Sequence, residues 1–268
     1  MFAKLTIDRL SGIMIRTGNS TLSEIAVVET SSDLNRIASK EEKTLAEKAY
    51  RLLRADIIHG IRKPGEHLKV ATLKTQYKLG IAPIREAMQR LSSDGLVVPQ
   101  GQKGFIVAPL TLEELWGLTE ARTCLEIRAL ELSIERGDDR WEAGIVAAAY
   151  RLEKFDHMLM AGEPCLAEWE ERNREFHRAI LNACDVPWIM RLRDLLYDLH
   201  VRYRHMAVGG GRSNRNLARE HTDIRDAVLA RDFPRAKKLL EQHIVAAARG
   251  FEALMNNKSD DESPIRKK

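Results

Sequence analysis

The stretch LGIAPIREAMQRLSSDG, residues 79–95, constrains the fold most, because it predicts a short helix whose beginning and end are both marked. Pro83 suits the first turn of a helix, where its missing N–H leaves no hydrogen bond unmade, and Gly95 suits a helix end. Apolar residues recur at steps of three and four and predict a face that packs on the protein: Ile84, Ala87, Met88 and Leu91. Arg85 and Gln89 lie four apart and share another face. The pattern alone leaves open whether that face meets solvent or a groove of DNA.

The segments around this helix predict two more helices and a small pair of strands. Apolar residues keep a helical period from Thr44 to Gly60, and a second short helix covers roughly residues 70–78. After the third helix, residues 96–98 and 105–107 form short β-like runs separated by a glycine-containing loop. Three helices followed by a basic two-stranded wing is the plan of a winged helix-turn-helix, whose third helix enters the major groove of DNA.

Charge is spread unevenly along the chain, although the formal total is only +4. Residues 43–110 hold twelve Lys and Arg against five Asp and Glu, a surplus of seven, so the remainder sums to −3. Such a basic segment suits a polyanion, because neutralising phosphate is the main sequence-independent term in DNA binding. Arg85 can read a guanine edge, a contact worth roughly 1–3 kcal/mol of discrimination, and Arg90 suits phosphate. A surface ion pair between Arg85 and Glu86 is the alternative.

After Thr111 the pattern is almost wholly helical and predicts a bundle of about six helices. Their expected ranges are 112–136, 139–161, 166–184, 186–206, 213–231 and 233–256. The sequence therefore predicts a mainly α fold, with a flexible extension at 1–42, a winged helix-turn-helix with a small β wing at 43–110, an all-α bundle at 111–256 and a disordered tail at 257–268.

Composition narrows the class of protein further. No apolar run is long enough to span a bilayer, and the N-terminus lacks a compact apolar segment with a cleavage site, so we expect no membrane contact. The three cysteines have no close-set pair, which argues against a disulfide framework and a cysteine zinc site. These features favour the cytoplasm.

Histidines in the second half have spacings that could serve a metal. Asn173 and His177 lie four apart on one helix face, and His221 and His243 lie 22 residues apart on successive helices. Imidazole nitrogens with one oxygen donor suit zinc or nickel. Spacing alone does not separate such a site from histidines that serve the core or the surface.

The first part of the chain resembles the DNA-binding domain of the GntR family of bacterial transcription regulators. The residues that carry this likeness run in order: Leu53, Arg54, Ile57, Ile58, Gly60, Pro64, Gly65, Leu68, Leu73, Pro83, Ile84, Arg85, Glu86, Ala87, Leu91, Gly95, Leu96 and Gly104. The likeness implies DNA contacts by Arg85 and, in the wing, by Gln102, Lys103 and Gly104, with Arg54 near phosphate. The family often has Ser-Arg-Thr before the proline, whereas this chain has Gly80-Ile81-Ala82, so no arginine is transferred to position 81.

The second part is similar to the FCD ligand-binding domain of the FadR-like branch of this family. The matching stretches are LTEARTCLEIRALELSIERG, NREFHRAI and REHTDIRDAVLARDFPRAKKLLEQHI. The likeness implies a metal set of Asn173, His177, His221 and His243, with Asn where many members have Asp. It also implies that Arg122 points into the effector pocket and binds a carboxylate, whereas an exposed Arg122–Glu126 pair is the alternative. Arg202 and Arg204 are further pocket candidates.

A narrower likeness is to the carbon-starvation-induced, glutarate-responsive branch of the family. It implies a repressor of dicarboxylate catabolism that acts as a homodimer on a pseudo-palindromic operator in double-stranded DNA and responds to a small carboxylate. We expect no enzyme activity. A hydrolase using the three histidines is the first alternative, although no HExxH motif is present. A non-regulatory DNA-binding protein is the second.

Overall fold

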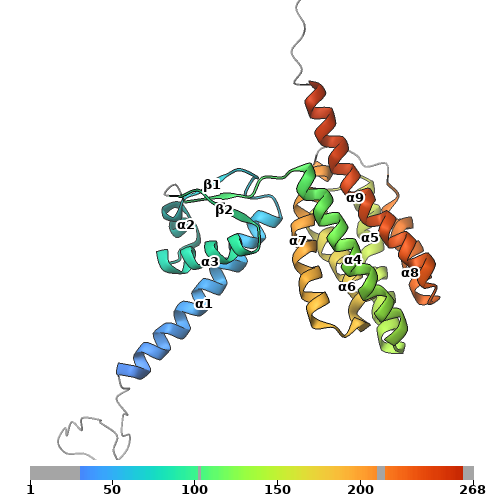
Figure 1. The fold of residues 1–268 in the computed structure, drawn as a ribbon, viewed down its shortest axis with the longest axis horizontal. Helices are drawn as coiled ribbons and strands as arrows, with labels where there is room; N and C mark the ends of the chain where they lie inside the picture. Colours follow the sequence, from blue (N-terminus) through green and yellow to red (C-terminus); the bar gives the residue numbers. More distant parts are fainter. Residues whose placement is uncertain (1–30, 102–103, 210–214, 262–268) are drawn as a thin grey trace, which may run out of the picture.

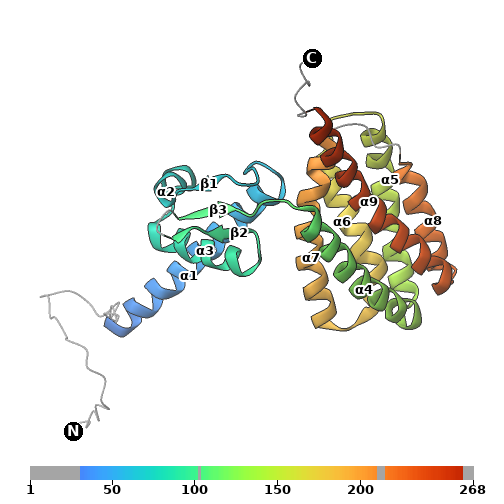
Figure 2. The same cartoon turned by 45° about the horizontal axis from the view of Figure 1, so that its top comes forward.

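The computed structural model describes residues 31–101, 104–209 and 215–261, which form two domains lying side by side (Figures 1 and 2). The N-terminal domain contains α1 (Ser31–Ile58), β1 (His67–Leu68), α2 (Val70–Tyr77), α3 (Ile81–Ser93), β2 (Val97–Pro99) and β3 (Phe105–Val107). The second domain contains α4 (Leu112–Arg136), α5 (Asp139–Met160), α6 (Leu166–Leu181), a 3-10 turn η2 (Asn182–Cys184), α7 (Pro187–Gly209), α8 (Leu217–Leu229) and α9 (Phe233–Asp261). The mainly helical fold with a small β wing is confirmed.

The N-terminal domain differs from its prediction at two places. Helix α1 begins at Ser31, so its backbone is helical through residues 31–42 of the predicted extension, and residues 1–30 lie outside the described part. Strand β1 was not predicted, and it pairs with β3 in an antiparallel sheet of order β1-β3-β2. A two-residue strand has no alternation that a sequence pattern could reveal.

Helix α3 is seated by the face that its apolar period predicts. Ile84, Ala87, Met88 and Leu91 have no exposed surface, and they pack in one cluster with Leu53 and other apolar residues of α1. Pro83 lies in the first turn, and Gly95, two residues beyond the last helical residue, has a φ of +74° that favours glycine. The buried face fixes the helix on α1 and leaves the opposite face exposed.

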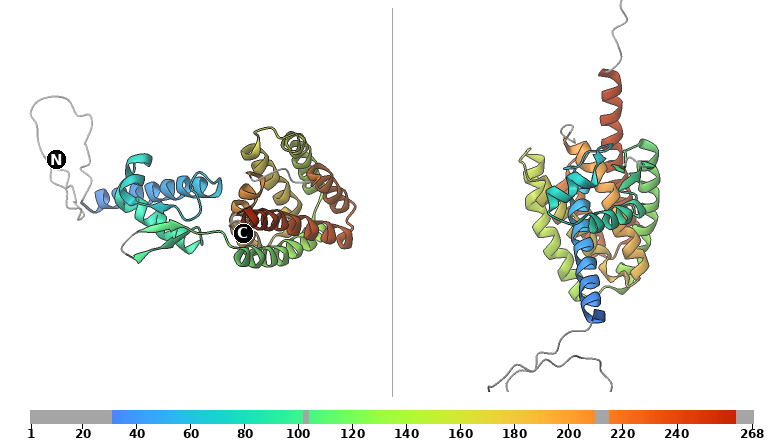
Figure 3. Two further views of the ribbon diagram at one scale, coloured as in Figure 1. Left: turned by 90° about the horizontal axis from the view of Figure 1, so that it is seen from above. Right: turned by 90° about the vertical axis from the view of Figure 1, so that its left-hand side faces the viewer.

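The six helices of the second domain follow the predicted ranges closely, because their ends carry local signals. The side chains of Thr111, Asp138 and Asn216 accept backbone hydrogen bonds at the starts of α4, α5 and α8. Asp232 does the same for Arg235 at the start of α9. Helix α9 continues to Asp261, past the predicted end at 256, and projects beyond the bundle (Figure 3). Residues 262–268 of the predicted tail lie outside the described part.

The two domains meet where α1 faces α7. Leu199 and Val201 of α7 belong to the same buried apolar cluster as Leu53 and Ile57 of α1. Residues 108–111 join β3 to α4 and connect the domains (Figure 2). In the parts of the chain described above, every helix is too short or too polar to cross a membrane.

Candidate functional site

Arg85, Glu86 and Gln89 of α3 have exposed polar side chains. Arg85 makes no side-chain hydrogen bond or ion pair with any residue in the described ranges, so the alternative pair with Glu86 is not formed. This surface is therefore free for a partner outside the chain.

Two other predicted DNA contacts are engaged within the protein. Arg90 binds Glu47 of α1 with a nitrogen–oxygen distance of 2.6 Å, and its guanidinium lies 4.1 Å from the centre of the Tyr50 ring. Arg54 forms an ion pair with Asp198 of α7 in the other domain. In this arrangement each guanidinium already pairs with an intramolecular carboxylate, and the predicted contacts of Arg90 and Arg54 with phosphate stay predictions.

The predicted wing contacts are only partly described. Gly104 has a φ of +91° just before β3, and a Cβ there would lie 3.4 Å from the Leu68 carbonyl oxygen. Glycine therefore allows the wing backbone to approach β1 closely. Gln102 and Lys103 lie outside the described residues.

Three histidines from three helices converge inside the second domain. His177 of α6, His221 of α8 and His243 of α9 are buried, and one ligand atom of each lies within 4.8 Å of the others. Carboxylates fix two of the rings from behind: Asp156 lies 2.8 Å from Nδ1 of His221, and Glu220 lies 2.8 Å from Nδ1 of His243. Because Nδ1 of each of these two rings faces a carboxylate, Nε2 is the nitrogen available to a metal ion. Carboxylate–histidine pairs of this kind orient the ligands in metal sites.

The donor set fits a divalent metal ion. Among the described residues, Nε2 of His221 and Oδ1 of Asn173 are buried polar atoms without a hydrogen-bond partner. Burial, together with nearby positive charges, lowers the pKa of His177 well below its usual value. Burial and the charge of Arg215 lower the pKa of His243 to about 3, although Glu220 acts in the opposite direction. The imidazoles of His177 and His243 are therefore neutral near pH 7 and can donate lone pairs. Three imidazole nitrogens with one amide oxygen match the preferences of zinc or nickel.

A second cluster surrounds the ring of Tyr197, beside the histidines. The carbon atoms of four guanidinium groups lie 4.4–5.2 Å from the centre of this ring: those of Arg122, Arg174, Arg193 and Arg204. The Tyr197 hydroxyl accepts a 2.8 Å hydrogen bond from Nδ2 of Asn173 and donates one of 2.9 Å to Glu170. Tyr197 thus connects a candidate metal ligand to the arginines.

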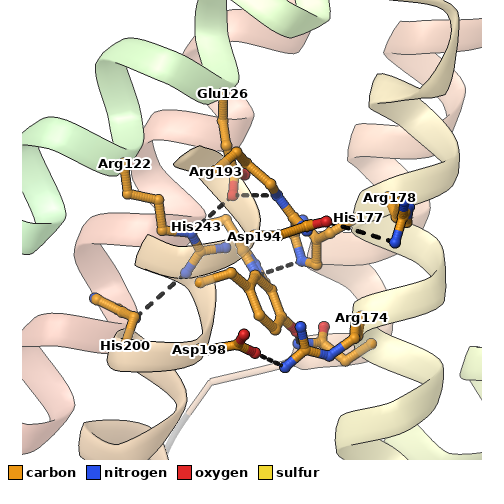
Figure 4. A network of polar contacts seen from close by, with 12 residues as sticks. Arg122, Glu126, Arg174, His177, Arg178, Arg193, Asp194, Asp198, His200 and His243 are labelled. Carbon is orange, nitrogen blue, oxygen red and sulfur yellow. Dashed lines mark hydrogen bonds and ion pairs between the residues drawn. The ribbon is translucent and has the colours of Figure 1, made fainter. Parts of the chain in front are cut away.

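Arg122 of α4 is buried next to this cluster, in the network of polar contacts drawn in Figure 4, which we call the polar interior. Its Nε donates to Oε1 of Glu126 at 2.8 Å, so the alternative pair exists, but it is buried rather than exposed. Burial alone would raise the pKa of Glu126, whereas the charges of Arg122 and Arg193 lower it below its usual value. Nη1 of Arg122 lies 3.3 Å from Nδ1 of His200, whose pKa burial lowers well below its usual value, so this nitrogen accepts the bond.

The other two pocket candidates lie in different places. Arg204 binds both oxygens of Glu170, at 2.9 and 2.6 Å, beside the Tyr197 ring. Arg202 donates to the carbonyl oxygen of Ala108 in the segment that joins the domains. Arg202 therefore belongs to the domain junction and not to the polar interior.

Sequence reasoning missed several residues of this site: Asp156, Glu170, Arg193, Tyr197 and Glu220. One signal was available on α7, where Arg193, Tyr197, His200 and Arg204 follow each other at steps of four, three and four. Such a polar stripe is normally interpreted as a solvated helix face. Here it is buried, because α4 and α6 contribute the carboxylates that neutralise it.

Comparison with known families and curated proteins assigns both domains. Residues 45–107 match bacterial regulatory proteins of the gntR family, and residues 117–246 match the FCD domain. The HTH-type transcriptional repressor GlaR of Escherichia coli is 37% identical over 200 residues, which cover 73% of this chain and 90% of that protein. The HTH-type transcriptional regulator BphR of Paraburkholderia xenovorans is 36% identical over 214 residues, which cover 80% of this chain and 87% of that protein.

Solved structures share the fold at lower identity. Escherichia coli McbR/YncC has a TM-score of 0.64 at 20% identity, over 80% of this chain and 98% of that chain. A transcriptional regulator GntR from Rhodococcus sp. RHA1 has a TM-score of 0.65 at 20% identity, over 78% of this chain and 97% of that chain. The fold of this chain is therefore one that these solved structures share.

Proposed function

This chain belongs to the gntR family of bacterial regulatory proteins, and we propose that it represses an operon for the catabolism of a small dicarboxylate such as glutarate. It is a transcription regulator with an FCD effector domain, and its relatives are regulators and not enzymes, which removes the hydrolase alternative. The name of GlaR supports the repressor role, and the likeness to the glutarate-responsive branch supports the effector class. The observation that carries the proposal is a buried cluster of arginines and histidines linked to an ion pair between the domains.

Operator recognition is assigned to the exposed face of α3. Arg85 and Gln89 are exposed and lie one turn apart, and Arg85 has no partner among the described residues. A helix held by its opposite face can enter the major groove, where arginine pairs with guanine and glutamine with adenine. A homodimer would place two such helices on the half-sites of a pseudo-palindromic operator.

A metal ion would be held by Asn173, His177, His221 and His243. The unpartnered Asn173 Oδ1 and His221 Nε2 support this assignment, as do the carboxylates behind two of the rings. When bound, such an ion would supply a positive charge and open coordination positions for a carboxylate oxygen.

The effector is assigned to the arginine cluster beside the histidines. Arg122 is buried, shares the carboxylate of Glu126 with Arg193, and lies against His200 and the Tyr197 ring. A guanidinium in such a place binds a carboxylate with two parallel hydrogen bonds. A buried position excludes water, which strengthens that pairing.

Coupling to DNA runs through two adjacent residues of α7. Tyr197 receives a hydrogen bond from Asn173, and the next residue, Asp198, pairs with Arg174 of α6 and Arg54 of α1. A ligand that moves Tyr197 therefore acts beside the contact that holds the DNA-binding domain. The equilibrium shifts only as far as the ligand's affinities for the two arrangements differ.

The test is fluorescence anisotropy with a labelled DNA fragment that the full-length protein selects from a random pool. We expect saturating glutarate to raise the Kd for this fragment by about 5- to 150-fold, the usual range of coupling between two sites. Arg122→Gln should keep the DNA affinity and lose the response. Arg128→Gln, an exposed arginine on the same helix, is the matched control and should respond like the parent protein.

Unchanged DNA affinity in the presence of succinate, glutarate and adipate would refute the effector assignment. Binding with little sequence preference and no response to any acid would favour the non-regulatory alternative.

A further inference from the structure

Arg193 of α7 is a buried arginine with an unused hydrogen-bond donor. Its side chain has no exposed surface. Nε donates to Oε1 of Glu126 at 3.0 Å, and Nη1 donates to Asp194 at 3.1 Å. Nη2 is buried and has no hydrogen-bond partner among the residues that the structure describes. A buried charged donor without a hydrogen-bond partner is unfavourable. The unpaired Nη2 therefore points to a ligand that supplies the missing acceptor.

This donor lies in the polar interior already assigned to the effector. Arg193 and Arg122 approach the same oxygen of Glu126 from two helices (Figure 4). Both guanidinium groups also lie over the Tyr197 ring, at 4.4 and 4.7 Å from its centre. Both guanidinium charges also act on His177. A ligand that reaches Arg122 from the histidine side is therefore close to Arg193.

The charges of this interior do not cancel. Arg204 is neutralised by Glu170, which it binds through two hydrogen bonds. Arg122 and Arg193, in contrast, share the single buried carboxylate Glu126. Asp194, the other partner of Arg193, is 31% exposed and also pairs with Arg178, 3.5 Å away. A buried surplus of positive charge favours an anion, and two guanidinium groups favour an anion with two charged ends.

We infer that Arg193 binds the second carboxylate of a dianionic ligand whose first carboxylate binds Arg122. This inference rests on the proposed function and adds the residue that selects diacids over monoacids. A ligand of the same length without the second carboxylate leaves Nη2 unpaired, and that loss discriminates against it.

One feature of the site favours a hydrogen-bond donor, instead of a carboxylate, at the second end of the ligand. Oε2 of Glu126 is also buried without a partner, so a terminal amide or amine would find an acceptor there. The two cations outweigh this single carboxylate, whose Oε1 already accepts from both arginines. The comparison of an acid with its amide therefore decides between the two.

The experiment is isothermal titration of the full-length, zinc-loaded protein with glutarate and with glutaramate, in which an amide replaces one carboxylate. We expect the parent protein to prefer glutarate by about 5- to 150-fold, the effect of leaving one buried donor unpaired. Arg193→Gln should abolish that preference by weakening glutarate binding while glutaramate binding changes little. Arg191→Gln, an exposed arginine two residues away on α7, should bind both ligands like the parent.

A purely structural role for Arg193 would weaken both ligands equally in Arg193→Gln, and that result would overturn the inference. Equal or tighter binding of glutaramate by the parent protein would do the same. If Arg193→Gln does not fold, Arg193→Lys keeps the charge without the planar fork, and a reduced preference for glutarate in this variant supports the inference. Failure of both ligands to bind the parent protein would overturn the proposed dicarboxylate effector as well, whereas glutarate binding without a preference overturns only the role of Arg193.

Discussion

The two domains place their charges in opposite ways. In the N-terminal domain the core is apolar, built from Leu53, Ile84 and Leu91 among others, and the arginines of α3 lie at the surface. Within the described ranges, every buried polar or charged side chain lies between Thr119 and His243, in the helical domain. The first domain is suited to a large charged partner that stays outside, and the second to a small charged ligand that enters.

This contrast has a physical basis in solvation. Phosphates of DNA remain hydrated around a protein, so the side chains that bind them are best placed in solvent. There the attraction between charges extends only over the distance that salt screening allows. A small anion is held more strongly where water is excluded, but the receiving arginines then need carboxylates such as Glu126 and Glu170 to be tolerated when no ligand is present. The helical domain is therefore the region in which single charge changes should affect stability most.

The largest effect should come from breaking a buried pair. Glu170→Ala leaves Arg204 buried without its carboxylate and should lower the free energy of unfolding of the helical domain by about 3–5 kcal/mol. Glu47→Ala breaks the exposed pair with Arg90 and should change stability by at most about 1 kcal/mol. Urea unfolding followed by tryptophan fluorescence measures the stability lost in Glu170→Ala, because all four tryptophans lie beyond residue 111. Urea unfolding followed by circular dichroism measures the change in Glu47→Ala. Equal losses would erase the distinction between the domains.

A change on the DNA-facing surface should leave stability intact and affect binding. Arg85→Ala should weaken selected DNA by about 1–3 kcal/mol for each half-site that the arginine reads, with an unchanged unfolding temperature. Arg219→Ala, which removes an arginine with an 80% exposed side chain from α8, is the control and should bind DNA like the parent. If the two variants bind DNA equally well, α3 is not the reading helix.

A change behind the histidines should weaken a metal without touching a ligand atom. Asp156→Asn keeps an acceptor for Trp169 but cannot accept from Nδ1–H of His221, so zinc or nickel affinity should fall about 10- to 100-fold. Titration calorimetry measures this against Asp139→Asn, an exposed change on the same helix. An unchanged affinity would mean that Asp156 serves only the fold.

The smallest effect should be the acid sensitivity of the helical domain. Burial raises the pKa of Glu126 and Glu170, but neighbouring arginines outweigh it and hold both below the usual 4.5, so both are ionised in the folded protein. Their contribution to stability is complete above about pH 4.5 and is lost as pH falls further, by at most about 1.4 kcal/mol per pH unit for each group. Tryptophan-monitored unfolding between pH 7 and 3.5 should show this slope, and Glu170→Gln should flatten it. A slope that Glu170→Gln leaves unchanged would assign the acid sensitivity to other groups.

Sequence patterns predicted the surface function better than the interior one. Apolar periodicity and capping residues located α3 and all six later helices, because these signals are local. The histidines His177, His221 and His243 could be grouped through the family likeness, and the structure brings them together. Arg193 of α7 could not be assigned to the interior, because an isolated stripe of charge indicates solvent, and only the packing of Glu126 and Glu170 against this stripe makes its burial tolerable. The pairing of Arg54 with Asp198 joins residues 144 positions apart, which no local pattern reveals.

The junction between the domains also bears on how this protein could be rebuilt. Only residues 108–111 separate β3 from α4, and Arg202 of α7 holds the carbonyl oxygen of Ala108. A chimeric biosensor that grafts another DNA-reading module onto this helical domain would keep that anchor if the splice falls before Ala108 and keeps the four-residue spacing. A graft made within α4 would remove this hydrogen bond, and the new module would be joined by a linker that Arg202 of α7 does not hold in place.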